Sequence, residues 1–153
     1  MLRLEHIHPM IVHFPIVLAL LALAFDLWWL VRCQATASPL IHLRTGTVLL
    51  TLGAAASVVA VVFGEIAHDI AVTKGVPDAT MDTHEGWGTA TMLVFGLAAL
   101  VRLFLWWRRM DETRGGIATA IALCAVVSVM VVITAYFGGH LVYDLGVNVG
   151  PGT

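Results

Sequence analysis

The chain has 153 residues, of which 59% are hydrophobic and only 12% are charged, and its formal net charge is -2. Mean hydropathy is +0.92. This balance is typical of a membrane protein rather than a soluble domain, and so small a net charge argues against nucleic acid as a partner. The length suits a single domain over residues 1–153. Cys33 and Cys124 form neither CxxC nor CxxCH, so we expect two free thiols.

The sequence HPMIVHFP, from His8 to Pro15, stands directly before the first apolar run. An apolar run near the N-terminus can be a signal peptide, and residues 35–37 (ATA) resemble a cleavage site. Trp28 and Trp29 separate the run from that site, so we predict a spanning helix that is retained. Pro15 fits this helix only in the first turn, where its missing N–H breaks no hydrogen bond.

Four segments are long and apolar enough to span a bilayer, which takes about 20 residues. In chain order they are residues 11–31, 45–67, 83–107 and 117–139. Backbone polar groups in lipid must be satisfied within the segment, so we predict helices. The expected fold is therefore all-α: a polytopic membrane protein forming an up-down four-helix transmembrane bundle. Asp82 with Glu85 resembles a capping box that opens the third helix, and Gly138-Gly139 should end the fourth.

Basic residues gather on one side of this predicted bundle. That side receives Arg32, Arg44, Arg108, Arg109 and Arg114, with Arg102 just inside it, whereas the other side receives Arg3 and Lys74. Cytoplasmic loops carry the excess of arginine and lysine, so the basic side should be cytoplasmic. We therefore expect a multi-pass protein of the bacterial inner (cytoplasmic) membrane with both termini on the periplasmic, outer side.

Histidines gather at the opposite, outer end. His13 opens the first predicted helix, His68 closes the second, His84 opens the third and His140 follows the fourth. Imidazole binds haem iron, copper, zinc and non-haem iron. Helices one and three are diagonal in such a bundle, as are two and four. His13 with His84, and His68 with His140, are thus the expected pairs for a b-type haem.

Two further histidines at this end, His6 and His8, are expected to be solvated at the interface or to cap a helix end. The spacing of Gly46, Gly53, Ala60 and Ala67, every seven residues, indicates close helix packing or room for a flat cofactor.

The same four histidines, at positions 13, 68, 84 and 140, are the expected ligands if the cofactor is instead a bare copper, zinc or iron ion. Glu65 and His68 form one E-x-x-H motif, but a di-iron bundle needs two such motifs and further glutamates. A third alternative is a cofactor-free structural subunit, whose histidines only make hydrogen bonds.

Two charges are predicted to lie inside the membrane. Asp26 and Arg102 each precede the cytoplasmic end of their helix by roughly five residues, a depth at which a lone charge is costly and such residues usually pair. We expect a structural salt bridge between the first and third helices. A proton or quinone role is the alternative.

The stretch HPMIVHFPIVLALLALAFDL resembles the start of a family of small bacterial membrane proteins of unknown function that begin HPM-x-VHFP. THEGWG near the third helix, and GGHLVYDLGVNVG near the end, extend the resemblance over nearly the whole chain; the latter is similar to the family's GG-x-LVY-x-x-G-V-x-V tail. Positions that match are His8, His13, Asp26, His84, Gly138, Gly139 and Tyr143. His68 and His140 have no clear counterpart. The resemblance implies a four-helix membrane domain, sometimes associated with cytochrome domains, without an established activity.

These features predict a b-type cytochrome module with haem b near the outer face. It would pass single electrons between a quinol and an outer-face acceptor such as a cytochrome, or anchor a larger redox complex in the lipid bilayer. The chain has no nucleophile elbow, phosphate loop or zinc-protease motif, so we expect an electron-transfer subunit rather than a stand-alone enzyme. The alternative is a membrane protein that binds or transports a metal ion. Homo-oligomers are compatible with so small a bundle.

Overall fold

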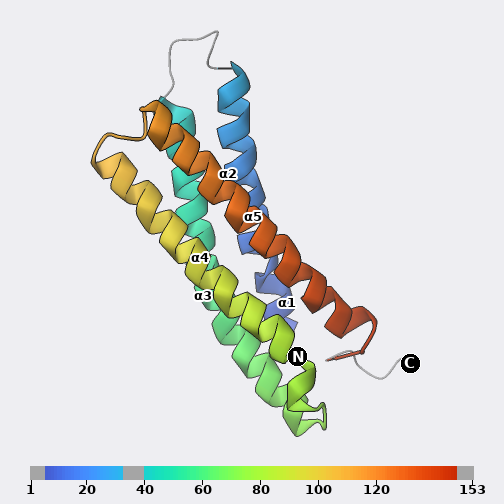
Figure 1. Ribbon diagram of the computed structural model, residues 1–153. Helices are drawn as coiled ribbons and strands as arrows, with labels where there is room; N and C mark the ends of the chain where they lie inside the picture. Colours follow the sequence, from blue (N-terminus) through green and yellow to red (C-terminus); the bar gives the residue numbers. More distant parts are fainter. Residues whose placement is uncertain (1–5, 33–39, 148–153) are drawn as a thin grey trace.

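The computed structural model describes residues 6–32 and 40–147, and every regular element in this part of the chain is a helix (Figure 1). Its elements are α1 (Ile7–Ile11), α2 (His13–Arg32), α3 (Leu40–Thr73), the 3-10 helix η2 (Asp78–Thr80), α4 (Asp82–Trp107) and α5 (Arg114–Tyr143). Four helical stretches are long and apolar enough to cross a membrane: Ile7–Val31, Arg44–Thr73, Asp82–Trp107 and Arg114–Tyr143. The predicted all-α four-helix membrane fold is confirmed. Cys33 lies outside the described residues.

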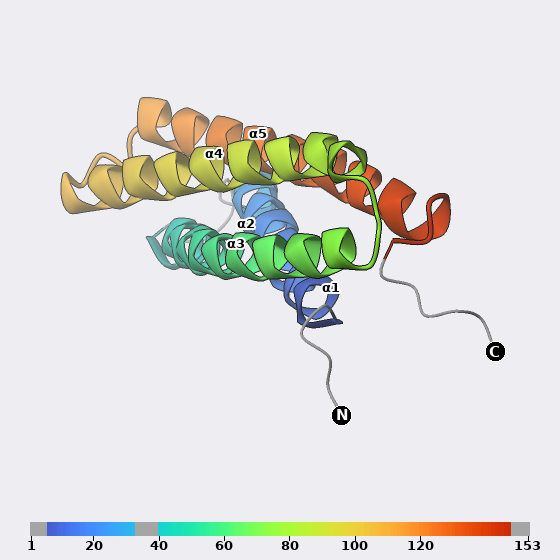
Figure 2. The same ribbon diagram turned by 90° about the horizontal axis from the view of Figure 1, so that it is seen from below.

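The four long helices run alternately up and down, and each packs against two neighbours. α2 contacts α3 and α5, and α4 contacts the same two helices, so α2 lies diagonally opposite α4, while α1 packs mainly on α3 (Figures 1 and 2). The start of α1, the α3–α4 connection and the end of α5 share one end of the bundle, here called the histidine end. The α4–α5 connection lies at the other end, here called the arginine end.

Several helix boundaries differ from the prediction. α3 continues six residues past Ala67 to Thr73, because Ala71 keeps facing the core and tertiary packing outweighs the weak helix propensity of the polar residues there. α5 likewise runs through Gly138-Gly139 to Tyr143, so the predicted stop at this glycine pair is wrong. The connection between α3 and α4 is correspondingly shorter than expected.

The predicted capping box at the start of α4 is also wrong. Met81 occupies the N-cap position and makes no side-chain capping bond. The Glu85 carboxylate instead lies 2.7 Å from Nδ1 of His68 on α3. Glu85 therefore contacts a neighbouring helix instead of capping the start of its own helix, as the sequence pattern had suggested.

The entry to the bundle is broken at Val12, between the short helix α1 and the long helix α2. Pro15, which has no N–H to donate, is the third residue of α2 and is buried. It therefore lies in the first turn of the helix, as expected.

Each helix buries one stripe of residues spaced alternately three and four positions apart, the spacing of one helical face. On α2 the stripe is Pro15, Ala19, Ala22 and Asp26. On α4 it includes Thr91, Phe95, Ala98 and Arg102. The central core combines these stripes in Ala19, Ala22, Leu50, Phe95, Ala98, Cys124, Val127 and Val131.

Small residues on α3 let the neighbouring helices approach closely. A Cβ at Gly53 would lie 2.5 Å from the Phe95 ring, so that ring packs directly on the α3 backbone. This glycine provides helix packing, the plainer of the two roles expected for the small-residue repeat.

Near the arginine end, the core holds a charged pair. Arg102 on α4 and Asp26 on α2 are 2% and 0% exposed, and the guanidinium binds the carboxylate through both terminal nitrogens, with Nη2 at 3.0 Å from Oδ1. Nε donates to the Thr47 hydroxyl at 3.1 Å, and Nη1 also contacts Sγ of Cys124 at 2.9 Å. Gly46 leaves the space, since a Cβ there would lie 2.3 Å from Asp26 Oδ1. The structure thus joins the two residues for which a salt bridge was expected.

Removing one partner of this pair should cost far more than removing both. Arg102→Met leaves a buried carboxylate unpaired, for which we expect a loss of about 3–5 kcal/mol of unfolding free energy. The double variant Asp26→Leu/Arg102→Met removes both charges and should recover most of that loss. Unfolding in detergent micelles measures both values; an equal loss in the single and double variants would contradict this account of the pair.

Candidate functional site

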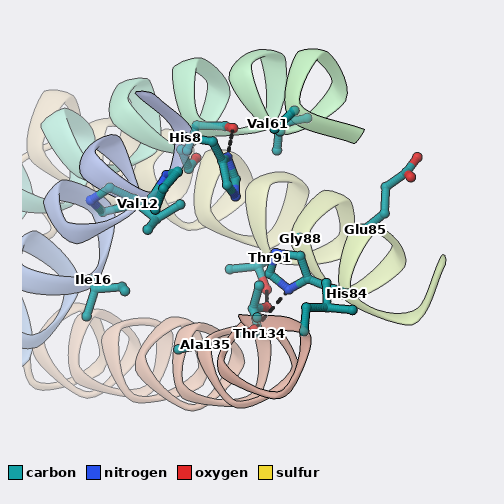
Figure 3. Close-up of a pocket in the computed structure, with 18 of the residues that line it drawn as sticks. His8, Val12, Ile16, Val61, His84, Glu85, Gly88, Thr91, Thr134 and Ala135 are labelled. Carbon is teal, nitrogen blue, oxygen red and sulfur yellow. Dashed lines mark hydrogen bonds between the residues drawn. The ribbon is translucent and has the colours of Figure 1, made fainter. Parts of the chain in front are cut away.

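A cavity of about 500 Å³ occupies the histidine end of the bundle, and residues from all five α-helices line it. Its volume is in the range of small-molecule and cofactor sites in proteins. Toward the middle of the bundle its wall is apolar, formed by Ile16, Phe95 and Val131. Two partly buried histidines, His8 and His84, supply imidazole groups to it (Figure 3).

His8 reaches the cavity from α1. Its Nδ1 lies 2.8 Å from the main-chain carbonyl of Ala60 on α3. A carbonyl oxygen can only accept a hydrogen bond, so Nδ1 carries the proton and donates it, while Nε2 keeps its lone pair. Figure 3 shows this second nitrogen pointing into the pocket.

His84 on α4 is held in the same way by the helix on its other side. Its Nδ1 donates to the main-chain carbonyl of Thr134 on α5 at 3.1 Å. The rings of His8 and His84 lie with their centroids 6.1 Å apart and their planes at 79°. Both rings are therefore held through Nδ1, and in the neutral form of each ring Nε2 is the nitrogen left with a lone pair.

Each of these rings packs on a glycine four residues after the carbonyl that it binds. His8 binds Ala60 and covers Gly64, and a Cβ at Gly64 would lie 3.1 Å from its ring. His84 binds Thr134 and covers Gly138, where a Cβ would lie 2.8 Å from its ring. A helical side chain lies over the turn that precedes it, so any side chain at these two positions would cover the carbonyl. We call these two surfaces the glycine seats.

Two threonines fix α4 against α5 behind His84. The hydroxyls of Thr91 and Thr134 are 2.8 Å apart, and that of Thr134 also lies within hydrogen-bonding distance of the Met130 and Trp87 carbonyls, at 3.0 and 3.2 Å. Thr134 thus positions α4 through its hydroxyl and the His84 imidazole through its main-chain carbonyl.

The structure places a different ring next to His84 from the one that the sequence predicted. The ring that the structure places against His84 is that of His8, whereas His13 is exposed at the edge of the cavity. The two histidines are five residues apart, which corresponds to about 140° around a helix. His8 lies seven residues before Pro15 and so continues the buried stripe of α2, which His13 does not.

The predicted pair of His68 and His140 is not brought together. The His68 ring lies between two carboxylates, with Nδ1 at 2.7 Å from Glu85 and Nε2 at 2.7 Å from Asp78, and so ties α3 to α4 and η2. Nδ1 of His140 lies 2.6 Å from the carboxylate of Asp144, one turn further along the chain. Both rings make hydrogen bonds to carboxylates, as expected for histidines with a structural role.

A site with three or more protein ligands for a metal ion is not found in the described part of the chain. What the cavity does present is two imidazoles from different helices in a largely apolar setting. This arrangement can bind one group from two sides through nitrogen.

Four membrane-length apolar helices around this cavity define a multi-pass α-helical membrane protein. The chain belongs to the family described as "Predicted membrane protein (DUF2231)", whose model matches residues 5–151. Neither the curated proteins nor the solved structures contain a match to the chain.

The glycine seats predict different effects for two adjacent substitutions. In Gly138→Ala the new methyl group would collide with the His84 ring, and we expect a loss of about 1–3 kcal/mol of unfolding free energy. In Gly139→Ala the nearest atom, in Tyr143, would be 3.9 Å away, so this control should be neutral or gain about 0.5–1 kcal/mol from higher helix propensity. Denaturant unfolding in detergent compares the two, and equal stabilities would argue against a seat at Gly138.

Proposed function

We propose that this protein is a b-type cytochrome module of the membrane, in which His8 and His84 are the two axial ligands of a haem. The observation that carries the proposal is the pair of buried imidazoles that approach each other across the cavity, each with Nδ1 bonded to a main-chain carbonyl. Ligand histidines are held in this way in metalloproteins, because the second hydrogen bond fixes the ring and leaves Nε2 for the metal.

The donor set fits a haem. Its porphyrin supplies four nitrogens, so the protein contributes no more than two axial ligands, whereas a bare zinc ion usually takes three or four ligands from the protein. His8 and His84 would hold the haem from two helices, since their ring centroids lie only 6.1 Å apart at the cavity.

The walls of the cavity suit a large apolar ring as well. Aliphatic and aromatic side chains such as Val12, Ile16 and Phe95 line it, and at Gly88 the wall carries no side chain at all. Its other polar lining residues include the buried Ser57 and Thr91, whose hydroxyls bond to other protein groups, and the exposed His13 and Glu65. A bound haem would supply one-electron chemistry, while the chain holds it, orients it and separates it from water.

The position of the cavity in the bundle indicates the membrane face at which the haem would exchange electrons with a partner. Arg44, Arg108, Arg109 and Arg114 lie at the arginine end, where the positive-inside tendency locates the cytoplasm. The histidine end then faces outward, with the start of α1 and the end of α5. We propose an inner-membrane protein of a bacterium that exchanges electrons between a membrane quinol and an acceptor at this outer face, alone or as the anchor of a larger redox complex.

Absorption spectra of the purified protein, as isolated and after dithionite, test the proposal. We expect a Soret band and a sharp alpha band on reduction, typical of b-type haem. His8→Ala and His84→Ala should each lose most of the haem, because each removes one axial ligand. His13→Ala and His140→Ala, which change exposed histidines of the same end, are the controls and should keep it.

Two results would count against this function. A featureless spectrum from protein produced with ample haem would remove the cytochrome proposal, and elemental analysis would then test a bound copper, zinc or iron ion. Full haem retention in both His8→Ala and His84→Ala would remove these residues as ligands, even in a protein that binds haem.

A further inference from the structure

A second, much smaller cavity lies at the arginine end, beside the buried ion pair. Its volume is about 10 Å³, and it is lined by Thr47, Arg102, Leu105, Asp111, Gly116 and Ala120. A cavity of this size holds about one water molecule. It is separate from the cavity of the proposed haem site, which occupies the other end of the bundle.

Asp111 contributes a buried carboxylate to this small cavity. The residue is only 9% exposed, and neither carboxylate oxygen accepts a hydrogen bond from the described protein groups. Arg44 is a neighbouring cation, but its Nε lies 3.9 Å from Oδ2, beyond hydrogen-bonding distance. Buried carboxylates without hydrogen bonds are rare in proteins, because desolvation of the charge is not repaid.

The surroundings select the kind of molecule that would satisfy this carboxylate. Arg44 and Arg102 both carry positive charge, so a metal cation is disfavoured, and the carboxylate itself disfavours an anion. A water molecule can donate to Asp111 and accept from a donor in the cavity lining, which includes Arg102 and Thr47.

We propose that this cavity is a water site that connects the buried Asp26–Arg102 pair to the protein surface. The connection begins at the surface with Arg44, whose side chain is 37% exposed and lies next to Asp111. The water then bridges Asp111 and Arg102. The ion pair that clasps α2 to α4 is then hydrated from the arginine end and exchanges protons with the solvent there.

Cys124 provides a local reporter of this hydration. Its side chain is fully buried and its Sγ is 2.9 Å from Nη1 of Arg102, while Ala120, one turn earlier on α5, lines the cavity. The S–H stretch of a thiol is resolved in infrared spectra, and it shifts when the proton is exchanged for deuterium. Exchange at Cys124 therefore reports whether solvent protons reach the ion pair.

The test measures S–H to S–D exchange of the full chain in detergent after transfer to D₂O, with Cys33 changed to Ser so that only Cys124 reports. We expect Asp111→Leu, which fills the cavity with an apolar side chain, to slow exchange several-fold. Glu112→Leu, an exposed neighbour in the same connection, is the matched control and should leave the rate unchanged.

A second measurement keeps the proposal falsifiable if Asp111→Leu does not fold. An experimental structure of the unaltered chain, at a resolution that shows ordered water, should have density for one water between Asp111 and Arg102. A dry cavity there, or equal exchange rates in Asp111→Leu and Glu112→Leu, would overturn the water site. Both measurements are independent of whether the protein binds haem.

Discussion

The site depends on one constraint: an imidazole buried in an apolar bundle needs a hydrogen-bond partner that does not compete for its second nitrogen. Both histidines of the cavity solve this with a main-chain carbonyl of the neighbouring helix, Ala60 for His8 and Thr134 for His84. The helix exposes that carbonyl only because a glycine follows four residues later. Two helix pairs, α1 with α3 and α4 with α5, therefore build the same seat on opposite sides of one cavity.

The two ends of the bundle bury different polar groups: an ion pair at the arginine end and two imidazoles at the histidine end. At the arginine end, Asp26 and Arg102 neutralise each other across the diagonal of the bundle, and Gly46 leaves them room. At the histidine end, His8 on α1 and His84 on α4 lie with their ring centroids 6.1 Å apart, and each ring is held by a main-chain carbonyl rather than by a charged group. A buried ion pair thus joins helices at one end of the bundle, while the other end contains a cavity lined by these two imidazoles.

Much of the fold could be predicted from the sequence, because span length and hydropathy are strong signals in lipid. The Asp26 and Arg102 pairing was also accessible, since a charge at that depth requires a partner. The helix ends could not be predicted in the same way. Gly138-Gly139 resembles a helix terminus, but the helix continues through it and Gly138 packs under the His84 ring. Glu85 resembles a capping residue, but its carboxylate binds His68. Hydropathy and local motifs do not reveal contacts between helices.

The position of His8 in the cavity has a readable signal in the sequence. His13 stands beside the apolar run, yet the buried stripe of α2, followed back from Asp26 through Ala22 and Pro15, leads to His8. The electron paramagnetic resonance spectrum of the oxidised, haem-loaded protein tests the central claim most directly. Two imidazole ligands predict a low-spin ferric signal that His13→Ala retains and that is largely lost in His8→Ala, where haem binding falls and any haem still bound becomes high-spin; a low-spin signal that survives in His8→Ala and is lost in His13→Ala would contradict the account.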